Sequence, residues 1–160
     1  MLGETLEDPF QKEGLEKNLD KSVNGIGLLP IKTTFLKRKI TRQVYSESIW
    51  PCLSNINGFE IHNGVTESLI SHRNLKSIFK NSELGWYVEN NVGGTIAGTY
   101  IHGIFENDIW REHYINLIRK SKNLPKLDNK TISYKLKREI IINNLAKEFN
   151  NHLNLSSLLN

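Results

Sequence analysis

Two short segments hold side chains that could do acid–base chemistry. His102 ends a run of β-forming residues, TIAGTYIH, and Gly103 follows it directly. The carboxyl end of a strand in an open α/β sheet is where reacting groups are usually placed. A histidine there is suited to accept and return a proton near neutral pH. A lone histidine at a strand end can equally be a surface residue or a buried, hydrogen-bonded one, so position alone leaves its role open.

The second segment is the alternating run NGFEIHNGVT. In a strand, Glu60 and His62 share one face, because side chains alternate. Phe59, Ile61 and Asn63 then share the other face. A carboxylate two residues from an imidazole can brace a pocket, contact a ligand or lie on a solvated face. These side chains and the strand-end histidine could be metal ligands by type, but their spacing does not require a metal, and no metal site is predicted.

Further strands must support these segments. Residues 26–36 and 38–45 predict two strands, and Pro30 makes the first an edge or bulged strand. Residues 57–66 predict a third. Residues 85–103 predict a hairpin, because two β-rich runs flank the turn-forming NVGG.

The last third of the chain is helical in pattern. Asn107 or Asp108 can cap a helix that runs to about Ser121, and its apolar positions recur at near-helical spacing. These positions are Ile109, Tyr114, Leu117 and Ile118. A longer helix is expected after Thr131, with one apolar stripe facing a core or a partner. That stripe consists of Ile132, Leu136, Ile140, Leu145, Phe149 and Leu153.

Composition bounds the class of protein. The 160 residues are 38% hydrophobic and 24% charged, which excludes a disordered or collagen-like chain. No apolar run approaches the roughly 18 residues of a membrane-spanning helix. The opening MLGETLEDPF is acidic, unlike a secretory signal. The single cysteine, Cys52, excludes an intrachain disulfide and a Cys-rich zinc site. We therefore expect one cytoplasmic α/β or α+β domain with no membrane partner.

The net charge of +4 arises in the C-terminal third. Residues 1–109 hold 11 Lys/Arg against 13 Asp/Glu, whereas residues 110–160 hold 10 against 4. The basic residues lie among Asn, Leu and Ile, with Tyr134 as their stacking aromatic. This pattern is unlike a base-stacking platform. A solvated helix face is therefore favoured, and no nucleic-acid partner is predicted.

Five short motifs occur in an order that one known family shares. They are Met1–Gly3, Asp8–Pro9, GIGLL at 25–29, GFEIHNG at 58–64 and GTYIHGIFEND at 98–108. Together they resemble the C-terminal part of the class I glutamine amidotransferase domain of the cobyric acid synthase family. The last two motifs are the specific pair, whereas GIGLL alone would be weak.

The resemblance implies a fold and its extent. The fold is α/β, of the flavodoxin-like type found in class I glutamine amidotransferases, and only its second half is expected here. Residues 1–160 would form a partial amidotransferase domain. The match covers about residues 1–120, and residues 121–160 would be a terminal helical segment.

The resemblance also implies a reaction. In class I amidotransferases a cysteine thiolate attacks the side-chain amide of glutamine while a histidine manages the proton, which forms a thioester and frees ammonia. The histidine corresponds to His102. The family's cysteine would lie five residues before Met1, outside this sequence. Cys52 lies between Pro51 and Leu53 without a small-residue elbow, so it is interpreted as a structural thiol.

Other positions of the site follow from the same resemblance. Glu60, His62 and Asn63 are expected to bind glutamine, while the bracing role and the solvated face remain open alternatives for the first two. Ordinary class I relatives carry a glutamate two residues after the histidine. Ile104 stands there in this chain, and the cobyric acid synthase branch also lacks that glutamate. Glu106 is interpreted as a carboxylate of a surface loop.

For the whole protein, the resemblance implies glutamine-dependent amidation in cobalamin biosynthesis. The family uses ATP and Mg in a domain absent here, so this chain is expected to bind no cofactor itself and to be inactive alone. Its expected partners are glutamine, the N-terminal synthase part or a separately encoded equivalent, and a corrin substrate. The alternatives are a non-enzymatic fragment or interaction module, or an amidotransferase of the cobyrinic acid a,c-diamide synthase or cell-wall amidation branch.

Overall fold

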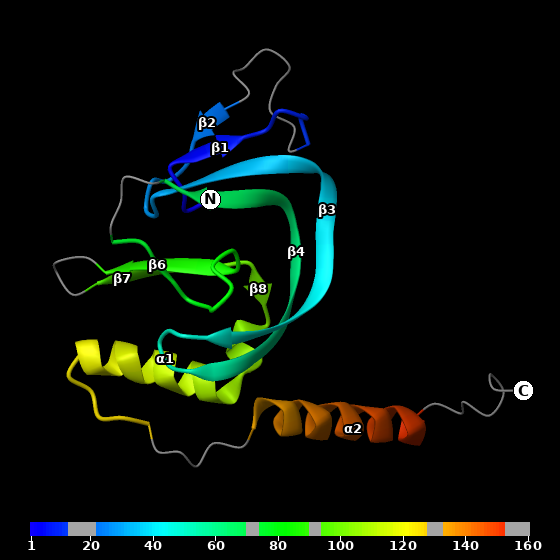
Figure 1. The fold of residues 1–160 in the computed structure, drawn as a ribbon. Coiled ribbons are helices and arrows are strands. Elements are labelled where there is room, and N and C mark those ends of the chain that lie inside the picture. The colour runs from blue at the N-terminus through cyan, green and yellow to red at the C-terminus, as the bar shows by residue number, and fades with distance from the viewer. Residues whose placement is uncertain (13–21, 70–73, 90–93, 128–132, 153–160) are drawn as a thin grey trace, which may run out of the picture.

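A long antiparallel hairpin forms the frame of the molecule. Its strands, β3 (Ile31–Ser48) and β4 (Ser54–Ser68), curve around other strands (Figure 1). The computed structural model describes residues 1–12, 22–69, 74–89, 94–127 and 133–152. The other elements are β1 (Thr5–Glu7), β2 (Ser22–Asn24), β5 (Lys76–Ser77), β6 (Gly85–Glu89), β7 (Thr95–Thr99), β8 (Ile101–His102), the 3₁₀ helix η1 (Ile104–Glu106), α1 (Asp108–Ser121) and α2 (Tyr134–His152).

The strands of the described residues form two sheets. The larger sheet has the order β2-β1-β3-β4-β8, and the smaller has the order β5-β6-β7. β1 runs parallel to β3, whereas the other pairings between these strands are antiparallel. The small sheet lies on the concave side of the β3–β4 hairpin (Figure 1). The fold is α/β with a mixed sheet, which confirms the predicted class.

The first predicted strands differ in one respect. The sequence predicts separate strands over 26–36 and 38–45, but β3 is continuous and residues 26–30 precede it. No glycine, proline or asparagine separates the two runs, so the chain bulges and does not turn. The bulge appears as a register shift against β4 between Phe35 and Ile40. Residues 26–30 form a loop whose N–H groups donate to carbonyls at the start of the chain.

The predicted hairpin is present, but His102 does not belong to it. β6 and β7 pair in antiparallel register, and residues 91–93 of the predicted turn lie outside the described residues. β7 ends at Thr99, the chain bends at Tyr100, and β8 then joins β4 in the larger sheet. The main-chain N–H of Tyr100 still donates to Leu84 beside β6. The chain therefore crosses from one sheet to the other immediately before His102.

The main core lies where β3, β4, β6 and α1 meet, and aromatic side chains fill it. Trp50 stacks on Tyr87 with 4.5 Å between ring centroids, and it meets Trp110 edge to face. The Nε1–H of Trp110 donates to the main-chain oxygen of Trp50 at 3.0 Å. A smaller cluster surrounds Trp86. These contacts attach α1 to the hairpin.

α1 covers the predicted range, with Asn107 at its N-cap position. Of the predicted apolar positions, Tyr114 packs against the core, together with Trp110. Trp110 is 3% exposed and Tyr114 packs beside it, whereas Ile109 and Ile118 are exposed. Trp110 and Tyr114 are one turn apart and stack at 5.1 Å. The larger apolar area of these two rings decides which face is buried.

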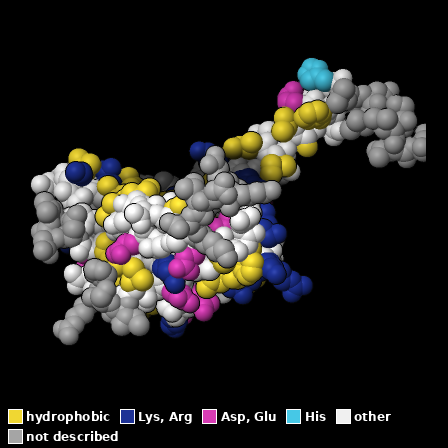
Figure 2. Space-filling model, turned by 90° about the horizontal axis from the view of Figure 1, so that it is seen from above, with side chains coloured by type: hydrophobic (Ala, Val, Ile, Leu, Met, Phe, Trp, Pro, Cys, Tyr) yellow, Lys and Arg dark blue, Asp and Glu magenta, His cyan; other side chains and the backbone are white. Residues whose placement is uncertain are grey.

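α2 is present as predicted, but no residue of the described helix is buried. It projects from the body, with apolar side chains on its surface (Figures 1 and 2). The predicted stripe is not continuous, because a five-residue step turns about 140° around a helix. Leu136 and Ile140 therefore face away from Leu145 and Phe149. The two outermost positions of that stripe lie outside the described residues. Among the described helices, none is long and apolar enough to cross a membrane.

Candidate active site

β4 separates the predicted site residues onto two faces. Glu60 is 2% exposed and His62 is partly buried, so their face is turned toward the inside of the hairpin. Phe59 and Ile61 are 43% and 39% exposed, so theirs is turned outward. The predicted alternation is confirmed. The solvated-face interpretation of Glu60 is wrong.

Glu60 is the centre of an ionic cluster on the inner face. Arg42 lies directly opposite on β3, and its Nε donates to Glu60 Oε2 at 2.5 Å. The other oxygen, Oε1, is 3.1 Å from His62 Nε2. A buried carboxylate must have such partners, because desolvation penalises an unpaired charge. The cluster supports the bracing role that the sequence left open.

The imidazole of His62 is held at both nitrogens. Its Nδ1 is 2.6 Å from the main-chain oxygen of Gly64. A carbonyl can only accept, so Nδ1 carries a proton and donates it. Nε2 faces the carboxylate of Glu60 on the opposite side of the ring. The ring plane of His62 is therefore set by two opposite contacts.

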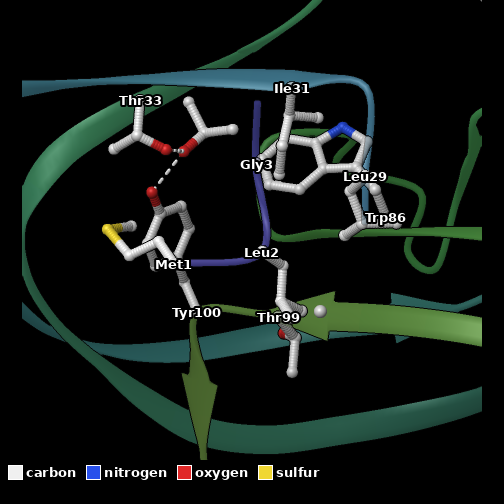
Figure 3. A pocket seen from close by; sticks show the side chains of 11 residues that line it. Met1, Leu2, Gly3, Leu29, Ile31, Thr33, Trp86, Thr99 and Tyr100 are labelled. Atoms are coloured by element: carbon white, nitrogen blue, oxygen red, sulfur yellow. Dashed lines mark hydrogen bonds between the residues drawn. The ribbon is translucent and has the colours of Figure 1, made fainter. Parts of the chain in front are cut away.

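Tyr100 covers the same imidazole. Its ring stacks on His62 with 3.9 Å between centroids and 16° between planes. The Tyr100 hydroxyl contacts the hydroxyl of Thr66, which lies 2.7 Å from that of Thr33. The dashed lines in Figure 3 follow these hydroxyls along one wall of an apolar pocket of about 230 Å³. The residue at the crossing between the two sheets is thus anchored to both strands of the long hairpin.

Asn63 lies beside a separate hollow. This hollow has a volume of about 490 Å³, and Asn63, His62 and Lys39 are among the residues that line it. It opens at the bulge, where the ladder between β3 and β4 is interrupted opposite Asn63. The structure therefore brings Asn63 and His62 to one hollow, with Glu60 behind the imidazole.

His102 is on the other side of the sheet. In β8 it pairs with Phe59 of β4, while Ile101 pairs with Glu60 and points into the core. The imidazole of His102 is exposed and stacks on the Phe59 ring, with 5.1 Å between centroids and 8° between planes. In the described residues, no hydrogen bond or ion pair links it to Glu60. The structure thus separates His102 from the Glu60–His62 pair.

Comparison with known proteins identifies the family of this arrangement. Residues 1–110 match the CobB/CobQ-like glutamine amidotransferase domain. The chain belongs to this family. It is 66% identical over 161 residues to the cobyric acid synthase of Prochlorococcus marinus strain MIT 9301, and 69% identical over 163 residues to that of strain MIT 9515. These alignments cover 99% and 100% of the chain but 32% of each relative. The chain thus spans about a third of the length of these curated relatives.

A buried apolar side chain fills the position two residues after His102. Ile104 is 6% exposed and packs in the core, so that position faces the protein interior. The carboxylate of Glu106 is 3.5 Å from the Arg138 guanidinium of α2, and both side chains are about half exposed. Glu106 is therefore a surface carboxylate with a partner of its own.

The start of α2 is anchored beside the same turn. The N–H of Tyr134 donates to Asp108 Oδ1 at 2.9 Å, and Arg111 donates to the same oxygen at 2.6 Å. These contacts, the main-chain one above all, lower the pKa of the Asp108 carboxyl. An ionised Asp108 thus connects α1 to α2.

Cys52 lies in the connection between β3 and β4. Its thiol contacts the hydroxyl of Ser54 at 3.9 Å, and its main-chain oxygen accepts from Ser48 at 2.7 Å. Neither a helix N-terminus nor a cationic group adjoins it among these contacts, and those are the features that activate a thiol. The structural interpretation of Cys52 is retained.

Sequence reasoning missed the partners of the predicted residues. Arg42, Phe59 and Tyr100 contact Glu60, His102 and His62 respectively. Cross-strand register decides these pairs, and a single sequence carries little signal for register. In the described parts of the chain, no group of three or more His, Cys, Asp or Glu side chains could hold a metal ion.

Proposed function

We propose that this chain provides the histidine-bearing part of a glutaminase site, which supplies ammonia for amidation in cobalamin biosynthesis. The observation that carries the proposal is the placement of His102. It stands within the GTYIHG motif at a strand end, its imidazole is exposed, and Phe59 holds the ring from one side. The family match and the identity to cobyric acid synthases support the same reaction.

The reaction requires a thiolate from outside these residues, since the described contacts of Cys52 include no activating group. The thiolate attacks the side-chain carbonyl carbon of glutamine, and His102 donates a proton to the nitrogen that leaves as ammonia. Water then adds to the thioester carbon, with His102 as the base that accepts its proton. Thiolate and glutamate are released, so the protein is restored.

Asn63 is proposed to bind the substrate at the hollow beside the bulge, because by strand alternation it shares the outward face of β4 with Phe59, on which His102 stacks. His62 lines the hollow too, but its imidazole lies on the inward face and is proposed to support the hollow from there. Glu60 acts through His62, because its carboxylate is buried behind the imidazole and holds it with Arg42. A carboxylate in that place fixes the ring without needing to touch glutamine itself.

The activity of the whole protein extends this proposal. We infer that the ammonia amidates carboxylates of a corrin, adenosylcobyrinic acid a,c-diamide, after activation by ATP and Mg on another part of the polypeptide. The sequence contains no GxxxxGK[ST] phosphate loop. No step assigned to these residues uses ATP or Mg, and their partner is the remaining synthase part.

The test is ammonia release from glutamine, measured for the 160-residue chain and for a longer polypeptide that carries the nucleophile. We expect no release from the chain alone and release from the longer protein. In the longer protein, His102→Ala should abolish release, whereas His113→Ala, at an exposed histidine of α1, should not. Ammonia release by the longer protein that survives His102→Ala would overturn the proposal. Release by the 160-residue chain alone that disappears in Cys52→Ala would overturn it as well.

A further inference from the structure

The strand that carries His102 is too short to be held by main-chain pairing alone. β8 has two residues, paired as His102 with Phe59 and Ile101 with Glu60. The chain then leaves the sheet at Gly103, whose φ of 78° is left-handed. If the ladder continued, Asn57 of β4 would face Ile104, but Ile104 has turned into η1 and is buried in the core.

The side chain of Asn107 takes the place of the missing ladder residue. Its Oδ1 accepts from the main-chain N–H of Asn57 at 2.9 Å, and its Nδ2 donates to the main-chain oxygen of Asn57 at 3.0 Å. A side-chain amide presents the same donor and acceptor as a peptide unit. The amide therefore pairs with β4 as one more strand residue would.

The same amide holds the turn that follows His102. Nδ2 also lies 3.0 Å from the main-chain oxygen of Ile104 and 3.3 Å from that of Gly103. Asn107 occupies the N-cap position of α1, yet its side chain makes no capping hydrogen bond to that helix. Its contacts are thus directed to the His102 turn and to β4, and not to the helix.

We propose that Asn107 is a positioning residue for His102. By pairing with Asn57 it fixes the turn against β4, which keeps the imidazole stacked on Phe59 and aimed out of the sheet. This inference rests on the proposed function for its catalytic consequence, whereas the placement of the ring can be measured without catalysis.

The variant Asn107→Asp separates the two possible roles of this residue. Aspartate is as favourable at an N-cap position as asparagine, so the change by itself does not penalise the start of α1. It can still accept from Asn57 N–H, but it cannot donate to the three carbonyl oxygens. The matched control is Asn116→Asp on the same helix. Among the described contacts of Asn116, its oxygen accepts from the N–H of Leu127 at 2.9 Å, and aspartate keeps that bond.

The first readout is the proton NMR shift of the His102 ring in the 160-residue chain. Stacking on Phe59 shifts these protons upfield through the ring current, and Phe59→Leu gives the value without the stack. We expect Asn107→Asp to move the shift most of the way to the Phe59→Leu value, and Asn116→Asp to leave it unchanged. A wild-type shift in Asn107→Asp would overturn the proposal.

The second readout is glutamine hydrolysis by the longer, nucleophile-bearing protein. Misplacement of a catalytic group by about an ångström can cost on the order of 100-fold in rate. We expect Asn107→Asp to lower kcat by about 10- to 100-fold with little change in KM, and Asn116→Asp to behave as wild type. An unchanged kcat in a protein that His102→Ala inactivates would refute the positioning role. Full activity in His102→Ala would instead refute the proposed function, and the NMR shift would still decide where Asn107 holds the ring.

A measurement on the unmodified chain covers the case in which Asn107→Asp does not fold. The side-chain amide protons of Asn107 should exchange slowly and show a cross-relaxation peak to Asn57. Rapid exchange without that peak would overturn the proposal.

Discussion

Replacement of Glu60 by glutamine should destabilise the protein, because it removes the charge of a buried carboxylate that has two polar partners. The side chain of Glu60 is 3% exposed, that of His62 is 13% and that of Arg42 is 57%. A glutamine side chain at this position would keep the shape and accept from Arg42, and its NH2 could donate to an unprotonated His62 Nε2, but the charge that strengthens both contacts would be gone. A hydrogen bond to a charged group is worth about 1.5–3 kcal/mol and a neutral one about 0.5–1.5 kcal/mol. The exposed Arg42 side chain can be hydrated instead, so the loss of its contact with Glu60 lowers the unfolding free energy by about 0–1 kcal/mol.

We therefore expect Glu60→Gln to lower the free energy of unfolding by about 1–2 kcal/mol, because both contacts of Glu60 lose its charge. Urea unfolding followed by tryptophan fluorescence is a suitable assay, since Trp50, Trp86 and Trp110 are all buried. The matched control is Glu67→Gln, at an exposed position of the same strand, where the change should stay within about 0.5 kcal/mol. If both variants unfold at the wild-type urea concentration, the carboxylate does not brace His62 and the argument fails.

Three further predictions concern the elements around the site. Trp110→Ala should lower the unfolding free energy by about 3–5 kcal/mol, measured by urea unfolding, because it empties the centre of the aromatic core; a loss below about 1 kcal/mol would contradict that packing. Gly103→Ala should lower the unfolding free energy by about 1–2 kcal/mol, because alanine is strained in the left-handed backbone conformation of this residue. An added Cβ would meet nothing nearer than 3.7 Å, so no steric clash adds to that cost. Thermal unfolding at two scan rates checks this. The pKa of the Asp108 carboxyl is lowered, so its hydrogen bond to the N–H of Tyr134 stabilises the folded protein fully above the ordinary carboxyl pKa. That stabilisation is lost as pH falls through the lowered value. Amide exchange at Tyr134 should thus keep its protection at the ordinary carboxyl pKa of about 3.9 and lose it only at lower pH, and Asp108→Asn should remove that pH dependence.

The sequence predicted the local pattern of the site correctly, because strand alternation is a property of consecutive residues. Glu60 and His62 share a face, and Phe59 and Ile61 share the other. The range of α1 also followed from local signals, namely the Asn-Asp start and helical spacing. Its packed face followed only in part: Tyr114 packs on the core, whereas Ile109 and Ile118 stay exposed because the aromatic core receives Trp110.

Tertiary structure decided which of these residues meet. Arg42 reaches Glu60 because β3 and β4 pair in one register across the hairpin, despite the bulge. His102 reaches Phe59, and not Glu60, because the chain crosses between sheets at Tyr100 and pairs with β4 at that position. Such pairings depend on main-chain hydrogen bonds between distant segments. These hydrogen bonds are alike for nearly every residue type. Residue identity therefore determines the alternation along each strand, while the contacts across strands are set only when the whole fold selects a register.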